Sequence, residues 1–97
     1  MTISIAKHTW VYAVFNFSEG NEQLTGFQDQ ASGTFIPILK TNHEAEVFLG
    51  YIPREPGTRY EVQAIMFEDV LNYARANGSL VYLVNEKGEI LEKETPV

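Results

Sequence analysis

The chain contains no cysteine. A disulfide framework, a thiol nucleophile and a cysteine-zinc site are therefore excluded, and we expect the protein to act in the reducing cytoplasm. No segment approaches the roughly 18 consecutive apolar residues of a membrane-spanning helix, and the N-terminus lacks the pattern of a signal peptide. Seven Lys and Arg oppose 13 Asp and Glu, giving a formal net charge of −6. We therefore expect no nucleic-acid or membrane partner, because an acidic chain repels both phosphate backbones and anionic lipids.

The sequence also lacks the short motifs of common catalytic and nucleotide-binding sites, namely G-x-x-x-x-G-K-[ST], G-x-G-x-x-G and G-x-S-x-G. Its acidic residues Glu44, Glu46, Glu68 and Asp69 fall at outward or capping positions of predicted helices. Acid–base catalysis needs two converging titratable groups instead. We therefore expect no catalytic residue and no cofactor, with a small enzyme whose site forms at a dimer interface as an alternative.

The pair His43-Glu44 begins as the zinc-protease signature H-E-x-x-H does. The second histidine of that signature would stand at position 47, which is Val47. Thr41 and Glu44 instead have the spacing of a helix capping box, and Gly50 is placed to end the helix. The pattern predicts a helix between Thr41 and Gly50 and no metal site.

The remaining segments alternate between strand and helix patterns. Aromatic and β-branched runs predict strands, and apolar residues spaced i, i+3, i+4 and i+7 predict a second helix over residues 67–77. Residues 22–33 are polar with two glycines and are interpreted as a loop or irregular hairpin arm. Residues 51–58 contain two prolines and a glycine and are interpreted as a loop. The predicted strands are residues 9–17, 34–39, 59–65, 80–84 and 89–92.

The resulting order, β-β-α-β-α-β-β, predicts one α+β domain over residues 1–97. Right-handed crossovers on short connections would place both helices on one face of a mixed sheet, forming a two-layer sandwich. Residues 1–8 would form an N-terminal arm and residues 93–97 a frayed tail.

Several of these segments carry a family resemblance. FIPIL precedes a Thr-initiated helix that ends in Phe48-Leu49, a second helix begins FEDVL, and Gly78 leads into the strand LVYLVN. With the opening WVYAVF, these features cover about two-thirds of the chain and resemble the N-terminal domain of the SseB family of small bacterial proteins. The resemblance implies the same α+β layer and supplies no catalytic residues.

Both helices on one face would leave the other face of the sheet open. This open face would be a contiguous aromatic and aliphatic patch, larger than a soluble monomer usually exposes. Its aromatic content is typical of interface cores. We therefore expect a non-catalytic protein-interaction or regulatory module that self-associates as a homodimer. Alternatively, the N-terminal arm with Ile3 and Ile5, or residues 22–33, covers this face. The predicted interface residues are Trp10, Tyr12, Val14, Ile36 and Ile38.

A second alternative is a small-molecule sensor with its ligand between the open face and residues 51–58. Its polar and aromatic contacts would be Tyr51, Arg54, Arg59 and Tyr60. The competing interpretation is that both arginines only neutralise neighbouring acids on an acidic surface.

Overall fold

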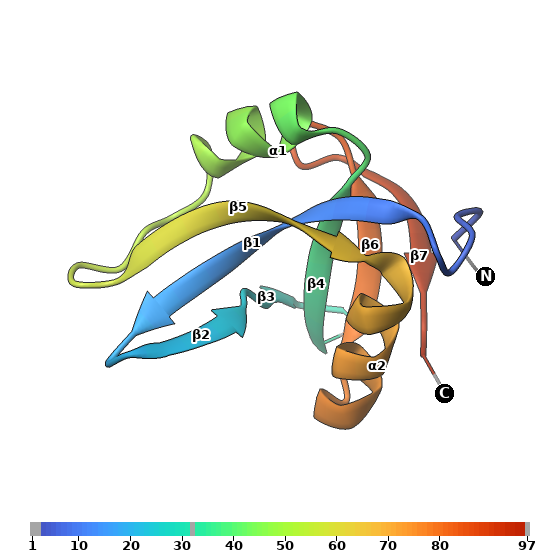
Figure 1. Cartoon of the computed structure of the whole chain (residues 1–97), viewed down its shortest axis with the longest axis horizontal. Coiled ribbons are helices and arrows are strands. Elements are labelled where there is room, and N and C mark those ends of the chain that lie inside the picture. The colour runs from blue at the N-terminus through green and yellow to red at the C-terminus, as the bar shows by residue number, and fades with distance from the viewer. Residues whose placement is uncertain (1–2, 32, 97) are drawn as a thin grey trace.

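The structure is a computed structural model that describes residues 3–31 and 33–96. Its described residues form seven strands and two helices (Figure 1). In chain order these are β1 (Trp10–Ser18), β2 (Asn21–Leu24), β3 (Phe27–Asp29), β4 (Gly33–Leu39), α1 (Asn42–Leu49), β5 (Arg59–Met66), α2 (Phe67–Asn77), β6 (Leu80–Val84) and β7 (Ile90–Glu94).

All seven strands belong to one mixed sheet, which confirms the predicted α+β class. β1 pairs antiparallel with β5 over eight residue pairs and also contacts β2 and β4. β4 and β6 are parallel, and β7 closes the far side antiparallel to β6. β5 and β7 therefore lie at the two ends of the sheet, and among the described residues β2 and β3 each pair with one strand only.

The two helices pack on opposite faces of this sheet, so the prediction that they share one face is wrong. On β1, Val11 and Ala13 pack in the cluster that contains α2, whereas Val14 packs in the cluster that contains α1. β4, β5 and β6 all run in the same direction. The connection from β4 to β5 runs across the sheet toward the β5 edge, and the connection from β5 to β6 runs back toward the β7 edge. Right-handed crossovers of opposite direction place their helices on opposite faces.

The N-terminal arm covers the α2 face rather than the face that carries Trp10. Ile3 is buried in the α2 cluster, and Ile5 packs against it. The backbone carbonyls of Lys7 and Thr9 accept hydrogen bonds from the first two backbone amides of α2, each at 2.9 Å. These amides have no intrahelical partner, and the N-cap residue supplies no side-chain bond. The arm thus both caps α2 and buries apolar surface.

The tail predicted to fray from residue 93 is ordered through Glu94. β7 includes Lys93 and Glu94, which pair with β6. The Glu94 carboxylate also accepts a hydrogen bond of 3.0 Å from the backbone N–H of Ile3. Pairing with a buried strand and with the arm therefore overrides the polar composition of the tail. Val97 lies outside the described residues.

Residues 22–33, predicted as a loop or irregular hairpin arm, contain a ribbon that changes partner at a bend. β2 pairs with β1, and β3 pairs with β4. Thr25 and Gly26 lie between them, and the Thr25 N–H donates to the Val14 carbonyl at 2.9 Å. A Cβ at Gly26 would lie 2.9 Å from Cγ2 of Thr34, closer than carbon atoms approach. A side chain at this position would therefore force Thr34 to shift.

We expect Gly26→Ala to lower the free energy of unfolding by about 1–3 kcal/mol, the usual cost of forcing a methyl group into a packed site. Thr34→Ser is the matched background, because it removes Cγ2 and retains the hydroxyl that accepts from Nε2 of Gln28 at 2.9 Å. In that background the cost of Gly26→Ala should fall by about 1 kcal/mol. Urea unfolding of the four proteins measures the difference, and an equal cost in both backgrounds would contradict the steric explanation.

Candidate functional site

The five residues predicted to line an open apolar face do not form one. Val14, Ile36 and Ile38 are buried in the chain's own core, and Tyr12 is half-buried. Ile36 and Ile38 lie under α2, whereas Tyr12 and Val14 lie under α1. Only Trp10 is exposed, with 60% of its surface accessible. The predicted open face is therefore wrong, because each face of the sheet is covered by its own helix.

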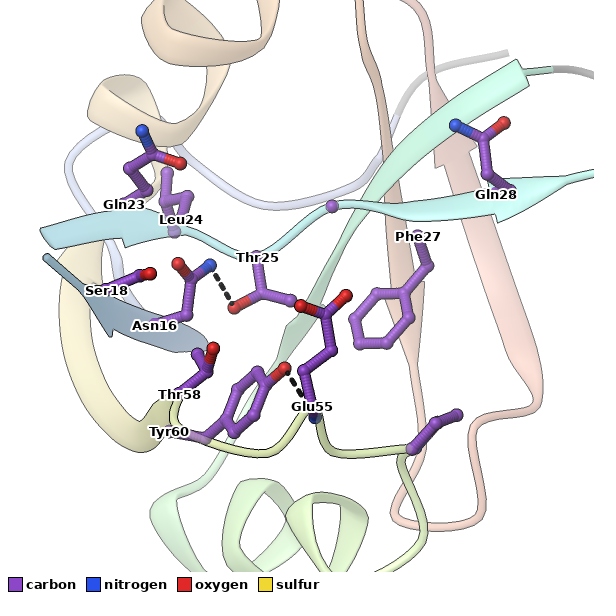
Figure 2. Close-up of a pocket in the computed structure, with 12 residues that line it drawn as sticks. Asn16, Ser18, Gln23, Leu24, Thr25, Phe27, Gln28, Glu55, Thr58 and Tyr60 are labelled. Atoms are coloured by element: carbon purple, nitrogen blue, oxygen red, sulfur yellow. Dashed lines mark hydrogen bonds between the residues drawn. The ribbon is translucent and has the colours of Figure 1, made fainter. Parts of the chain in front are cut away.

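A cavity of about 490 Å³ lies beside the Thr25-Gly26 bend, and we call it the corner cavity. Five parts of the chain surround it: β1, the β2–β3 ribbon, its bend, residues 51–58 and the start of β5 (Figure 2). Its volume lies in the range typical of small-molecule sites. The lining residues are Asn16, Ser18, Gln23, Leu24, Thr25, Gly26, Phe27, Gln28, Pro53, Glu55, Thr58 and Tyr60.

Hydrogen bonds between segments distant in sequence fix the walls of the corner cavity. Asn16 on β1 donates from Nδ2 to Oγ1 of Thr25 at 3.0 Å, which ties the bend to the strand. Tyr60 on β5 accepts at its hydroxyl from the backbone N–H of Glu55 at 3.3 Å, which ties residues 51–58 to the sheet. Figure 2 shows Thr25, Glu55 and Tyr60 surrounding a common space. The cavity is therefore held by the fold and by two cross-links.

The lining is polar but almost uncharged. It contains three side-chain amides, three aliphatic hydroxyl groups and the Tyr60 phenol, together with apolar surface from Phe27, Leu24 and Pro53. Glu55 is its only ionisable carboxylate, and no Lys, Arg or His lines it. Such a surface can donate and accept hydrogen bonds, and it can stack on a flat molecule. It offers no positive charge to an anion.

Of the four residues predicted to contact a small molecule, the structure places only Tyr60 in this cavity. Arg54 donates from Nη2 to the Leu49 carbonyl at 3.2 Å and so caps the end of α1. The Arg59 guanidinium lies 4.5 Å from the ring centre of Phe17 and 3.8 Å from Glu61. Tyr51 is 68% exposed. Both arginines thus have structural partners, although residues 51–58 do border the cavity as predicted.

The sequence interpretation missed Asn16, Thr25 and Glu55. Asn16 was the one polar residue on its face of an otherwise apolar strand, which was an available signal. Thr25 and Glu55 gave none, because they lie in segments that look like ordinary polar loops. Their role depends on contacts between segments about 30 residues apart in the chain.

The His43-Glu44 pair lies at the start of α1, as the capping interpretation requires. The backbone N–H of Glu44 donates to Oγ1 of Thr41 at 3.1 Å, which confirms Thr41 as the N-cap. The Glu44 carboxylate accepts from the Thr41 hydroxyl at 3.0 Å rather than from its backbone N–H. Within residues 3–31 and 33–96, no three His, Asp or Glu side chains are grouped as metal ligands. In the same residues, no helix is long and apolar enough to cross a membrane.

A second polar contact lies at the end of β3. The buried ring of Tyr82 stacks on Phe35, with ring centres 4.4 Å apart. Its hydroxyl donates to Oδ2 of Asp29 at 2.7 Å, and the Ala31 N–H donates to Oδ1 at 3.0 Å. These bonds, with a smaller contribution from Lys93, lower the pKa of Asp29 below its ordinary value of 3.8. Asp29 therefore anchors β3 as a carboxylate.

A carboxylate with a lowered pKa stabilises the folded state above the unfolded pKa, and this contribution is lost as the pH falls through the folded pKa. We expect Tyr82→Phe to raise the pKa of Asp29 toward 3.8, because the largest cause of the shift is removed. The variant should also lose less stability than the wild type between pH 6 and the acid limit. NMR titration of the Asp29 carboxyl carbon measures the first effect. An unchanged Asp29 pKa in Tyr82→Phe would contradict the assignment.

Comparison of this chain with family models, with curated proteins and with solved structures finds no match. The resemblance to the SseB N-terminal domain therefore stays a prediction.

Proposed function

We propose that the chain is a non-catalytic, small-molecule-binding module whose site is the corner cavity. The observation that carries this proposal is the convergence of hydrogen-bonding groups from β1, β5, the bend and residues 51–58 on one hollow of about 490 Å³. Binding sites are typically preformed hollows of this size with a few convergent polar groups. The apolar sheet face that favoured a protein-interaction module is buried within the chain, so it supports that function no longer.

The lining favours a neutral or cationic ligand. The one carboxylate, Glu55, has no side-chain ion pair among the described residues, and no cation lines the hollow. An anion would pay the cost of desolvation with no opposite charge to offset it. The rings of Phe27 and Tyr60 add apolar faces that can stack on a sugar, a base or an alkylammonium group. The proposed ligand class is thus a polar molecule that has one flat or apolar face and no negative charge.

The proposal of binding without catalysis is supported by the kinds of group in the cavity. General acid–base catalysis uses two titratable groups that converge on the substrate. Among the lining residues, Glu55 is the only carboxylate, and the Tyr60 hydroxyl beside it already accepts a hydrogen bond from the Glu55 backbone N–H. No second carboxylate and no His of the described chain lines the cavity to act with Glu55. The cytoplasmic location we infer is supported by the cysteine-free composition.

Ligand-detected NMR with four probes tests the proposal: glucose, uridine, choline and, as an anionic control, citrate. We expect at least one neutral or cationic probe to bind and citrate not to bind. Tyr60→Ala should weaken that binding at least about tenfold, which corresponds to about 1.4 kcal/mol. Tyr51→Ala is the matched control, because it removes an exposed tyrosine outside the cavity and should leave affinity unchanged. Binding of citrate alone, or equal effects of the two variants, would reject the proposal.

A further inference from the structure

The two outer edges of the sheet differ in how they are protected. Edge strands expose unpaired backbone groups, and proteins usually block them with charges, irregularities or a covering segment. β7 has all three: Glu92, Lys93 and Glu94 make up most of the strand, and its register with β6 shifts once. The arm also binds it, through hydrogen bonds from Ile3 and Ser4 to the Glu94 and Glu92 carboxylates. This edge is closed to a further strand.

The β5 edge is less protected, because its register is unbroken and its two charged residues, Arg59 and Glu61, both lie in its first half. β5 is eight residues long, contains no proline and pairs with β1 in an unbroken register. Its last five residues, VQAIM, carry no charge. Within the part of the chain that the structure describes, no strand pairs with its outer side. A regular edge with an uncharged second half is competent to pair with another strand.

The hydrogen bonds of β1 identify which β5 groups face outward. Backbone groups of successive residues in a strand point to alternate sides. The Val14 carbonyl accepts from Thr25, so Val14 faces the β2–β3 ribbon and not β5. Its partner across the ladder, Val62, must therefore direct its own N–H and C=O away from β1. By alternation Tyr60 and Ala64 do the same, while Glu61, Gln63 and Ile65 face β1.

These outward groups fit a second copy of the same strand. In an antiparallel pair centred on Val62, the N–H and C=O of Val62 bond to Val62 of the other copy. Tyr60 of each copy then lies opposite Ala64 of the other and exchanges two further bonds, as in any antiparallel ladder. In this register Glu61 lies opposite the Gln63 amide of the other copy. A pair centred on Glu61 would instead place the two Glu61 carboxylates opposite each other. The edge itself carries Arg59 and Glu61 and is neutral, so the net charge of −6 is not concentrated there.

We propose that two copies of this chain dimerise through their β5 edges, about a two-fold axis at Val62, to form one continuous sheet. Closed two-fold pairing uses the same surface on both copies and leaves no free β5 edge for further growth. Of the residues in this ladder, Tyr60 also lines the corner cavity, whereas Val62 and Ala64 do not. A substitution at Ala64 therefore tests the dimer separately from ligand binding.

Light scattering behind a sizing column tests the proposal. The wild type should approach twice the chain mass of 11.0 kDa as concentration rises. Ala64→Lys places a charge at an exposed position of the β5 edge and should raise the dimer dissociation constant at least about tenfold. Leu91→Lys is the matched control, since it adds the same charge to an exposed position of β7. It should leave the dimer intact.

Amide hydrogen exchange of the wild type tests the register without any substitution. Exchange at Tyr60, Val62 and Ala64 should slow with rising concentration. Residues 61, 63 and 65 should not change, because β1 already binds their amides. A monomer at every concentration would overturn the proposal. So would a dimer disrupted only by Leu91→Lys, or one whose three outward amides exchange freely.

Discussion

Ile38→Ala should lower the free energy of unfolding by about 2–5 kcal/mol, the range observed for truncating buried aliphatic side chains. Ile38 is fully buried in the cluster between the sheet and α2. Its neighbours are held by the sheet and the helix, so they cannot close the resulting cavity. A loss of this size is a large fraction of the roughly 5–15 kcal/mol that stabilise a typical domain. Urea unfolding followed by circular dichroism measures it.

The matched control for this prediction is Ile90→Ala, which truncates the same side chain on β7 where 45% of it is exposed. That change should cost about 1 kcal/mol or less. Trp10→Ala, at the one exposed position of the predicted interface, should also have a small effect on stability. If Ile38→Ala left stability unchanged and dissociated a dimer instead, Ile38 would belong to an interface and the two-faced core would be wrong.

Phe48→Ala should cost about 3–5 kcal/mol, because it removes the main aromatic side chain that α1 packs on the opposite face. The Phe48 ring lies edge-on to Phe27, with ring centres 6.3 Å apart, and belongs to the α1 cluster with Val14 and Leu39. Its Cε1 lies 3.3 Å from where a Cβ of Gly88 would stand, so the turn before β7 closes over it. Thermal and urea unfolding both report this loss.

His43→Ala serves as the control on the same helix, since His43 is exposed in the first turn and should change stability by about 0.5 kcal/mol or less. The milder pair Ile38→Val and Phe48→Leu tests whether the two faces are separate. Residues in different clusters with no shared partner have additive effects, to within about 0.5 kcal/mol. Strong coupling between the two substitutions would show that both helices pack against one core.

Local patterns in the sequence predicted most of the elements. Three local signals depend on residues a few positions apart. They are the aromatic and β-branched run over residues 9–17, the helical spacing of Phe67, Val70 and Leu71, and the Thr41 cap. Each of these predictions agrees with the structure. Short-range periodicity records which side of an element is buried, so it survives in the sequence.

The placement of α1 and the corner cavity could not be predicted in the same way. The face that a helix covers depends on strand order, and the order places β5 beyond β1 rather than beside β6. Without the strand order, the apolar residues on the two sides of β1 were interpreted as one covered face and one open face. The cavity depends on the Asn16–Thr25 and Glu55–Tyr60 contacts, and no local pattern marks such pairs in advance.

Ligand binding in the corner cavity is tested most directly by a titration of isotope-labelled protein with the probe that binds best among glucose, uridine and choline. The side-chain amides of Asn16, Gln23 and Gln28 all line the corner cavity and report on it. We expect their resonances to shift together and saturate, while the amides of Asn72 and Asn85, which lie outside the cavity, do not shift. Shifts confined to Asn72, Asn85 or the Trp10 indole would contradict binding in the corner cavity.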